Sequence, residues 1–179
     1  MQRNLVLLAS LALMLSACAT MDTQPAVDMT NATPEGQIVS IMMAANRGEA
    51  DQGQAAATRA TSEAVRSFAQ MMVSDHTTAL QAVQDTSNRA GVNAADSPIA
   101  MTLQSGSQQT ITNLATYSGA AFDRAYMQSQ VDLHQWLLTA LDGSLIPSAR
   151  TPELRTLLQT QRGAVAMHLE RARSIAGSM

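Results

Sequence analysis

The sequence predicts an all-α fold, a four-helix bundle with one further short helix. Its 179 residues are enough for roughly one domain. Alanine occurs 31 times, against 9 Val and 6 Ile. This balance favours helices over sheets, because Ala loses no side-chain entropy in a helix whereas β-branched residues suit pleated surfaces. Apolar residues also recur at the helical period in four long segments. Since aromatic residues make up 3% of the chain, small side chains are expected to pack the core.

Helix boundaries are marked by capping residues, prolines and glycines. Each of three starts has a hydroxyl residue followed by Pro at the first helical position: Thr33-Pro34, Ser97-Pro98 and Thr151-Pro152. Stops are expected where glycine can adopt a left-handed conformation: Gly91, Asp142-Gly143 and Gly177. These signals predict helices near residues 35–59, 62–90, 98–115, 119–142 and 152–176.

The third of these helices is the shortest and has the weakest apolar pattern. We interpret it as a crossover between two helical hairpins. Two hairpins joined by one long connection make the ferritin-like version of the four-helix bundle. The predicted fold is therefore a ferritin-like four-helix bundle with a short crossover helix, and the bundle domain is placed at residues 35–176.

The amino terminus has the pattern of a lipoprotein signal. Residues 1–17 carry one charge, Arg3, followed by the apolar run Leu5–Leu15. This run is much shorter than the about 20 residues that a membrane-spanning helix needs. Cys18 completes the sequence Leu-Ser-Ala-Cys, which matches a lipobox, and it is the only cysteine, so no intramolecular disulfide can form. Acylation of Cys18 is therefore predicted; the alternative is an ordinary signal peptide with a chance cysteine.

Residues 18–34 are interpreted as the lipidated cysteine and a flexible tether. The residue after Cys18 is Ala19 rather than Asp, which in the Gram-negative lipoproteins that this signal resembles implies sorting to the outer membrane. The domain would then lie in the periplasm, with the membrane as its partner through the lipid. Nucleic acid is not expected as a partner, because the net charge is −3 and no basic excess is available to neutralise phosphates. No feature identifies a protein partner.

One polar residue falls on the inward apolar stripe of each long helix. These four candidate metal ligands are Glu49, His76, His134 and His168. Three further residues lie near them in sequence as candidate hydrogen-bond partners of the ligands: Asp75, Asp123 and Tyr126. Imidazole and carboxylate groups suit Fe, Zn, Mn or Cu, and bundle cores are common places for such sites.

The spacing of the histidines does not match a di-iron centre. Such a centre uses Glu-x-x-His pairs, but the residues three positions before the histidines are Val73, Val131 and Val165. A mononuclear site is the remaining metal alternative.

We place the two hairpin turns near residues 61 and 147 and count residues outward from each turn. This count puts Glu49 and His76 at nearly the same height along the bundle axis, and it separates His134 from His168 by about 12 Å. We therefore expect these two histidines not to share an ion. The other interpretation is that each buried histidine hydrogen-bonds a protein partner, such as Glu49, Tyr126 or Gln161.

Parts of the sequence resemble a known family. The stretches are Phe68–His76, which contains Met-Val-Ser-Asp-His, then Phe122–Met127 followed by His134, and His168 in the last helix. Over about residues 35 to 175 the chain resembles the bacterial family called domain of unknown function 4142. The resemblance implies an exported protein, often described as an outer-membrane protein, with a ferritin-like helical fold. It implies no established activity.

These observations favour a lipid-anchored periplasmic bundle with a binding or structural role in the cell envelope. Neither a nucleophile elbow nor a glycine-rich phosphate loop is found, so the sequence favours a protein without enzymatic activity or cofactor over an enzyme, and it leaves both questions open. The alternative is a mononuclear metal-binding protein, with a redox or metal-buffering role, on the same scaffold.

Overall fold

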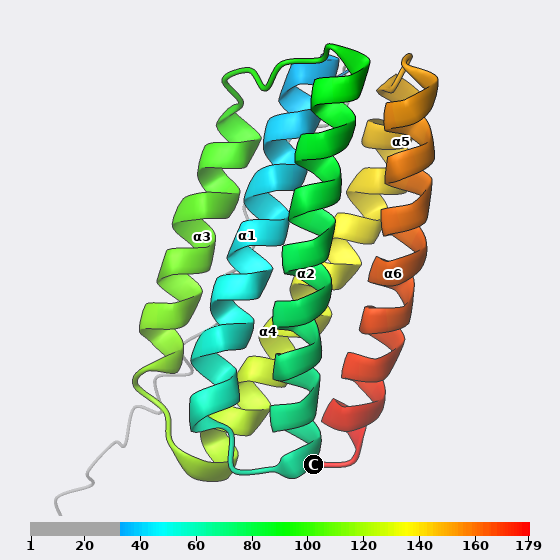
Figure 1. The fold of residues 1–179 in the computed structure, drawn as a ribbon. Coiled ribbons are helices and arrows are strands. Elements are labelled where there is room, and N and C mark those ends of the chain that lie inside the picture. The colour runs from blue at the N-terminus through cyan, green and yellow to red at the C-terminus, as the bar shows by residue number, and fades with distance from the viewer. Residues whose placement is uncertain (1–32) are drawn as a thin grey trace, which may run out of the picture.

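A computed structural model describes residues 33–179 of the chain, and the predicted signal peptide, Cys18 and most of the predicted tether lie outside this range. The described residues are helical and contain no strand (Figure 1), which confirms the all-α prediction. The elements are α1 (Glu35–Arg59), α2 (Glu63–Ala90), α3 (Pro98–Leu114), α4 (Gly119–Ala140), the π-helix η1 (Leu141–Leu145), α5 (Ile146–Ser148) and α6 (Pro152–Gly177).

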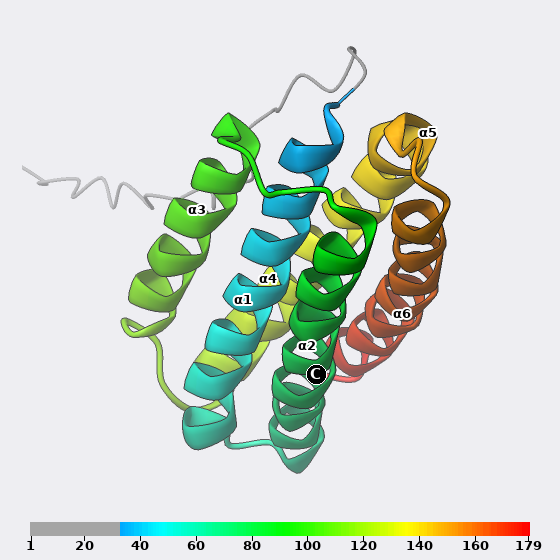
Figure 2. The ribbon, with the colours of Figure 1, turned by 45° about the horizontal axis from the view of Figure 1, so that its top comes forward.

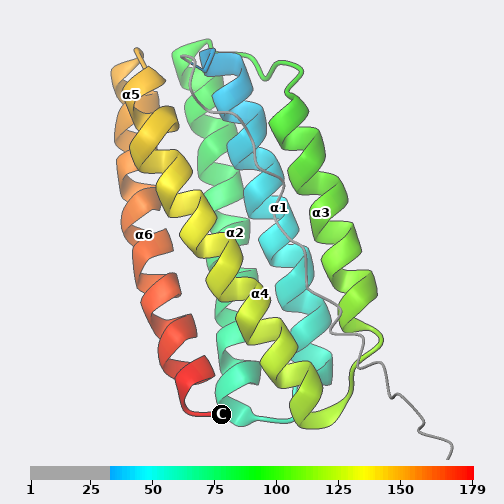
Figure 3. The ribbon, with the colours of Figure 1, turned by 180° about the vertical axis from the view of Figure 1, so that it is seen from behind.

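Helices α1, α2, α4 and α6 form the bundle, and α3 packs against the outer side of α1 (Figures 1 and 2). Among the four bundle helices, the most extensive pairings are α1 with α2 and α4 with α6. Seen from behind, α4 lies across α1 and α2 and beside α6 (Figure 3). Because α3 returns the chain to the end where α2 began, α2 and α4 run in the same direction. This single crossover gives the predicted ferritin-like topology.

A layer of buried polar side chains divides the core into two apolar clusters. The upper cluster includes Ile38, Ile41, Leu141, Leu145 and Leu158. The lower cluster includes Ala56, Phe68, Met72, Phe122 and Tyr126. Between them lie Asn46, Glu49, Gln52, His76, Gln130, His134, Gln161 and His168, all buried. The candidate ligands therefore sit at mid-height in the bundle, shielded from water above and below.

Capping follows the prediction at some helix ends and departs from it at others. Ser97 caps α3 as predicted, since its Oγ accepts a hydrogen bond from Ala100 N at 3.2 Å. The hydroxyl of Thr151 does not cap its own helix. It donates instead to the carboxylate of Glu35, which also accepts from the backbone N–H groups of Arg150 and Thr151 at 2.7 Å each. The first turn of α1 thereby holds the start of α6.

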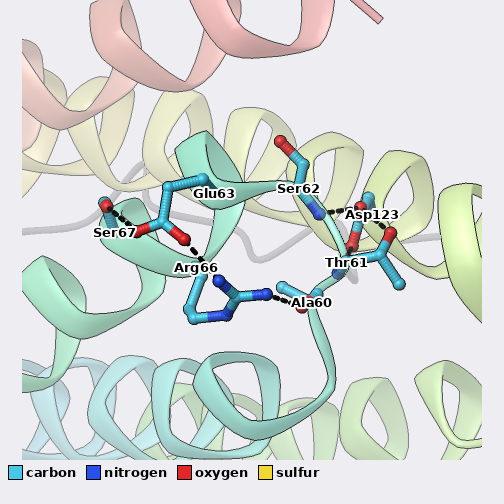
Figure 4. A network of polar contacts seen from close by, with 7 residues as sticks. All are labelled: Ala60, Thr61, Ser62, Glu63, Arg66, Ser67 and Asp123. Atoms are coloured by element: carbon cyan, nitrogen blue, oxygen red, sulfur yellow. Dashed lines mark hydrogen bonds and ion pairs between the residues drawn. The ribbon is translucent and has the colours of Figure 1, made fainter.

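Asp123 makes the matching connection at the other end of the bundle (Figure 4). Its carboxylate accepts from Thr61 N at 3.0 Å, Ser62 N at 2.8 Å and Thr61 Oγ1 at 2.6 Å. These bonds join the start of α4 to the start of α2. Figure 4 also shows Glu63 paired with Arg66, whose guanidinium reaches the carbonyl of Ala60. Carboxylates at both ends therefore set how the helices align along the bundle axis.

The predicted stop at Asp142-Gly143 is wrong. The chain stays helical through η1 and α5 as far as Ser148. Leu141 and Leu145 explain this, because both are fully buried in the upper cluster. Burying a leucine contributes about 1.5–3 kcal/mol, whereas glycine in a helix costs about 1 kcal/mol. The turn into α6 is consequently displaced to residues 149–151.

Phe68 tests the packing of the lower cluster, since its side chain is 0% exposed. We expect Phe68→Ala to lower the free energy of unfolding by about 3–5 kcal/mol, because the small neighbouring side chains leave a cavity. That loss corresponds to a fall in melting temperature of about 10 °C. Met101→Ala is the matched control, because Met101 is 61% exposed, and thermal unfolding should show it close to wild type. A change of only a degree or two in Phe68→Ala would contradict the core assignment.

Candidate metal centre

The structure brings all three histidines of the chain together in the polar layer. His76 comes from α2, His134 from α4 and His168 from α6, and each is at most 4% exposed. One ring nitrogen of each histidine lies within 4.8 Å of a ring nitrogen of the other two. The ring centroids are 5.3 to 5.7 Å apart. The rings thus form a compact triangle from three different helices.

The expectation that His134 and His168 lie about 12 Å apart is wrong. It assumed a turn near residue 147, whereas the helical backbone continues to Ser148. In the structure the turn is centred on Arg150, with His134 about 16 residues before it and His168 about 18 residues after it. At the rise of an α-helix, this difference of about two residues corresponds to only about 3 Å along the bundle axis. The π-helical continuation of α4 is therefore what brings these two rings level.

A chain of hydrogen bonds determines which nitrogen of His76 carries the proton. Gln161 Nε2 donates to Ala79 O at 3.1 Å, so Gln161 Oε1 is free to accept. Asn46 Nδ2 donates to this oxygen at 3.1 Å and to Met42 O at 2.7 Å. Asn46 Oδ1 must then be the acceptor in its 2.9 Å contact with His76 Nδ1. His76 therefore carries its proton on Nδ1.

The other two rings are oriented in the same manner. His134 Nδ1 lies 2.9 Å from the backbone carbonyl oxygen of Gln130, which can only accept. His168 Nε2 lies 2.9 Å from Asp75 Oδ2, a half-exposed carboxylate that likewise accepts. Each imidazole therefore donates its N–H away from the triangle.

The remaining nitrogens have no hydrogen-bond partner. They are Nε2 of His76, Nε2 of His134 and Nδ1 of His168. Each is a lone-pair acceptor, and none of the three rings has a proton left to donate to another. Leaving a buried polar atom unpaired costs about 1–3 kcal/mol. Three such atoms in one place are unusual for a folded core and point to a cation as the missing partner.

Protonation of the rings does not supply this cation at neutral pH. Burial lowers the pKa of His134 to about 4, although the carbonyl of Gln130 opposes this shift. Burial and the neighbouring imidazoles hold the pKa of His76 well below its usual value. Burial also lowers the pKa of His168, against the opposing hydrogen bond to Asp75. The rings are therefore neutral, as metal ligation requires.

Glu49 lies beside the triangle without belonging to it. Its expected contact with His76 is not formed, because Asn46 occupies that position, and Glu49 Oε1 lies 3.4 Å from His134 Nδ1 instead. Both carboxylate oxygens are buried without a hydrogen-bond partner. Burial raises the pKa of Glu49 to about 7, although the amide of Gln130 and the nearby imidazole of His168 oppose the shift.

Of the three residues predicted to hydrogen-bond the metal ligands, the structure places one beside a histidine. Asp75 contacts His168. Asp123 lies at the start of α4 and binds the turn before α2, away from the histidines. Tyr126 stacks on Phe122 with centroids 6.5 Å apart, and its hydroxyl has no partner. Sequence reasoning missed Asn46, for which the available signal was its position one turn before Glu49.

Fold and site together define a ferritin-like helical bundle with a cluster of three histidines in a polar core layer. The chain belongs to the family described as Domain of unknown function (DUF4142), whose family model matches residues 19–175. This confirms the resemblance found in the sequence. No curated protein and no solved structure matches the chain.

Among the helices of residues 33–179, none combines the length and apolar character needed to cross a membrane.

The hydrogen bonds predict a specific tautomer for each ring. In metal-free protein at pH 7 we expect a proton on Nδ1 of His76 and His134 and on Nε2 of His168, measured by long-range proton–nitrogen NMR. Lowering the pH should protonate His134 only near pH 4. In Asn46→Leu only His76 should lose its fixed tautomer, since the carboxylate of Asp75 still orients His168. A ring that is doubly protonated at pH 7 would contradict this arrangement.

Proposed function

We propose that this protein binds one transition-metal ion through His76 Nε2, His134 Nε2 and His168 Nδ1. The observation that carries the proposal is that each of the three buried rings brings a nitrogen within 4.8 Å of the other two, while one nitrogen of every ring is held by an oxygen acceptor and the other has no hydrogen-bond partner. Histidines that ligate metals almost always donate their other N–H in this way, which fixes the tautomer and raises the basicity of the ligand.

The dimensions of the triangle suit a single ion. Metal–nitrogen bonds to histidine are about 2.0–2.1 Å long, so tetrahedral ligand nitrogens lie about 3.4 Å apart. One ring nitrogen of each histidine lies within 4.8 Å of the other two, so each ring would move by about 1 Å or less to close on an ion.

The ligand set favours a mononuclear centre that uses imidazole. Zn, Cu and Fe accept such ligands, with Mn as a further candidate from the sequence. The structure gives the metal alternative more support than the cofactor-free interpretation. A purely structural cluster would be expected to pair its buried acceptors with donors, and here one nitrogen of each of the three neighbouring rings has no donor. We infer a metal-buffering or redox role on the ferritin-like scaffold.

Metal content tests this proposal directly. Protein purified without an affinity tag or chelator should hold about one equivalent of a transition metal, or should take one up after the metal has been removed. Saturation at about 100 times the dissociation constant should stabilise the fold by about 2.7 kcal/mol. The melting temperature should then rise by about 5–10 °C, measured by thermal unfolding with and without Zn²⁺.

His168→Ala is the informative variant, and Asp142→Asn is its matched control on the surface. We expect His168→Ala to lose stoichiometric metal and the metal-dependent rise in melting temperature, whereas Asp142→Asn keeps both, because Asp142 pairs with Arg162 far from the triangle. The metal-free proteins are compared first by circular dichroism to establish that each is folded. Folded wild-type protein that binds no Zn²⁺, Cu²⁺, Co²⁺, Mn²⁺ or Fe²⁺ would refute the proposal.

We also propose that the domain is anchored through acylated Cys18 to the outer membrane, facing the periplasm. The support is the lipobox Leu15-Ser16-Ala17-Cys18 directly after the apolar run, and the absence of any other cysteine in the sequence. Two or more acyl chains at one residue give stable anchoring.

The anchor is tested by metabolic labelling with a radioactive fatty acid. Cys18→Ser should remove the label, because no other thiol can be acylated, and should release the protein from the membrane fraction if the signal peptide is cut at another site. Ser16→Ala keeps a small residue in the lipobox and serves as the control that retains the label. An unchanged label in Cys18→Ser would refute the lipoprotein assignment.

A further inference from the structure

We propose that the metal ion reaches the histidine triangle between α2 and α6, and that the carboxylate of Asp75 is the first ligand it meets. This inference rests on the metal site proposed above, and it assigns to the surface a capture site for a divalent transition-metal ion. A buried metal site needs a path by which the ion enters. The exposure of the groups around the triangle indicates on which side of the bundle this path lies.

Of the three groups that hold the outer ring nitrogens, one is open to solvent. Asn46 is 3% exposed and Gln130 is 0% exposed. The side chain of Asp75, by contrast, is 41% exposed. Because Asp75 Oδ2 is bonded to His168 Nε2, the ring of His168 lies between the other two histidines and a carboxylate that solvent reaches.

Small side chains flank Asp75 at the boundary between α2 and α6, which lie side by side (Figure 1). Two hydrogen bonds cross this boundary, from Gln161 Nε2 to Ala79 O at 3.1 Å and between His168 and Asp75 at 2.9 Å. Ala79 lies one turn from Asp75 on α2, and Ala164 lies one turn from His168 on α6. Both alanines are partly exposed. The region between the two crossings is therefore covered by methyl groups.

The contacts on the other side of α6 establish that Ala164 faces α2. Arg162 pairs with Asp142, and Arg173 donates to Gln135. These two arginines mark the side of α6 that faces α4 and η1. Since successive residues are about 100° apart around a helix, Ala164 lies about 160–180° from both arginines, which is the side of α2.

The other three boundaries between bundle helices are closed by buried groups. Between α1 and α2, a Cβ atom added at Gly53 would lie 2.9 Å from Ala69 O, so these two backbones are in direct contact. Between α1 and α4, the buried amides of Gln52 and Gln130 are hydrogen-bonded to each other at 3.3 Å. On the side of α6 that faces α4, Leu169 is buried. Entry at these places would displace packed core groups.

Asp75 has an oxygen available to a cation. Among residues 33–179, Asp75 Oδ1 makes no hydrogen bond, and the ion pair of this carboxylate is with His168 through Oδ2. Transition-metal ions that bind imidazole also accept carboxylate oxygen. The bond to Asp75 is also the one hydrogen bond that the ring of His168 makes within the described residues, so a rotation of this ring that admits the ion breaks a single bond.

The test measures the rate at which metal-free full-length protein takes up Co²⁺, followed by stopped-flow absorbance. We expect Asp75→Asn to lower the association rate constant at least about tenfold, because the carboxylate that attracts the ion is lost. Asn keeps an oxygen that accepts the N–H of His168, so the ring stays oriented. Asp132→Asn is the matched control, since Asp132 is an exposed carboxylate on α4, two residues before His134 and hence at nearly the same height. It should load at the wild-type rate.

A second variant changes the path without changing any charge. Ala164→Leu should slow association and dissociation by a similar factor of at least about fivefold and leave the equilibrium dissociation constant unchanged, because it obstructs the path and not the site. Ala166→Leu is its control, because Ala166 is also partly exposed and lies about 160° around α6 from His168. Circular dichroism of the metal-free variants establishes first that each is folded.

An association rate constant within about twofold of wild type in either Asp75→Asn or Ala164→Leu would overturn the entry path and leave the metal site standing. In Asp75→Asn, a loss of affinity that arises from faster dissociation alone would likewise overturn it, since Asp75 would then act solely by positioning His168. Wild-type protein that binds neither Co²⁺ nor Zn²⁺ at equilibrium would overturn both proposals.

Discussion

The hydrogen bonds that hold the outer nitrogens of the three histidines determine the character of the core. Asn46, the backbone of Gln130 and Asp75 each accept one N–H, so every ring presents a lone pair inward. Burial keeps the rings neutral by disfavouring their protonated forms. These neutral acceptors have no hydrogen-bond donor among the described residues, and the metal ion that we propose would supply the missing interaction.

The rest of the fold serves to keep this arrangement aligned. Apolar clusters above and below exclude water from the polar layer. Glu35 joins α1 to the start of α6 at one end of the bundle, and Asp123 joins α4 to the start of α2 at the other. Because each carboxylate satisfies backbone N–H groups that a helix start leaves free, sliding one helix past another would break several hydrogen bonds together. The level of each histidine is therefore fixed from both ends.

The same scaffold differs in chemistry from the carboxylate-rich di-iron bundles. Valine occupies the positions where a Glu-x-x-His pair would place its acid, at Val73, Val131 and Val165. Glu49 is the buried acid in the layer, and it lies outside the nitrogen triangle. A centre of three neutral imidazoles suits a single ion, as we propose, rather than a pair of ions bridged by carboxylates.

Much of the fold could be predicted from local features of the sequence. The crossover, the inward positions of Glu49, His76, His134 and His168, and the helix ranges other than the end near residue 142 follow from periodicity, prolines and glycines, because these features act over one or two turns. The site could not be assembled in this way. Periodicity determines which face of a helix a residue occupies, but the level at which two helices meet depends on where the connecting turn falls. That turn was moved by the burial of Leu141 and Leu145, an interaction with distant residues. The tautomers depend likewise on Asn46 and Gln161, which lie 115 positions apart in sequence and meet only in the folded bundle.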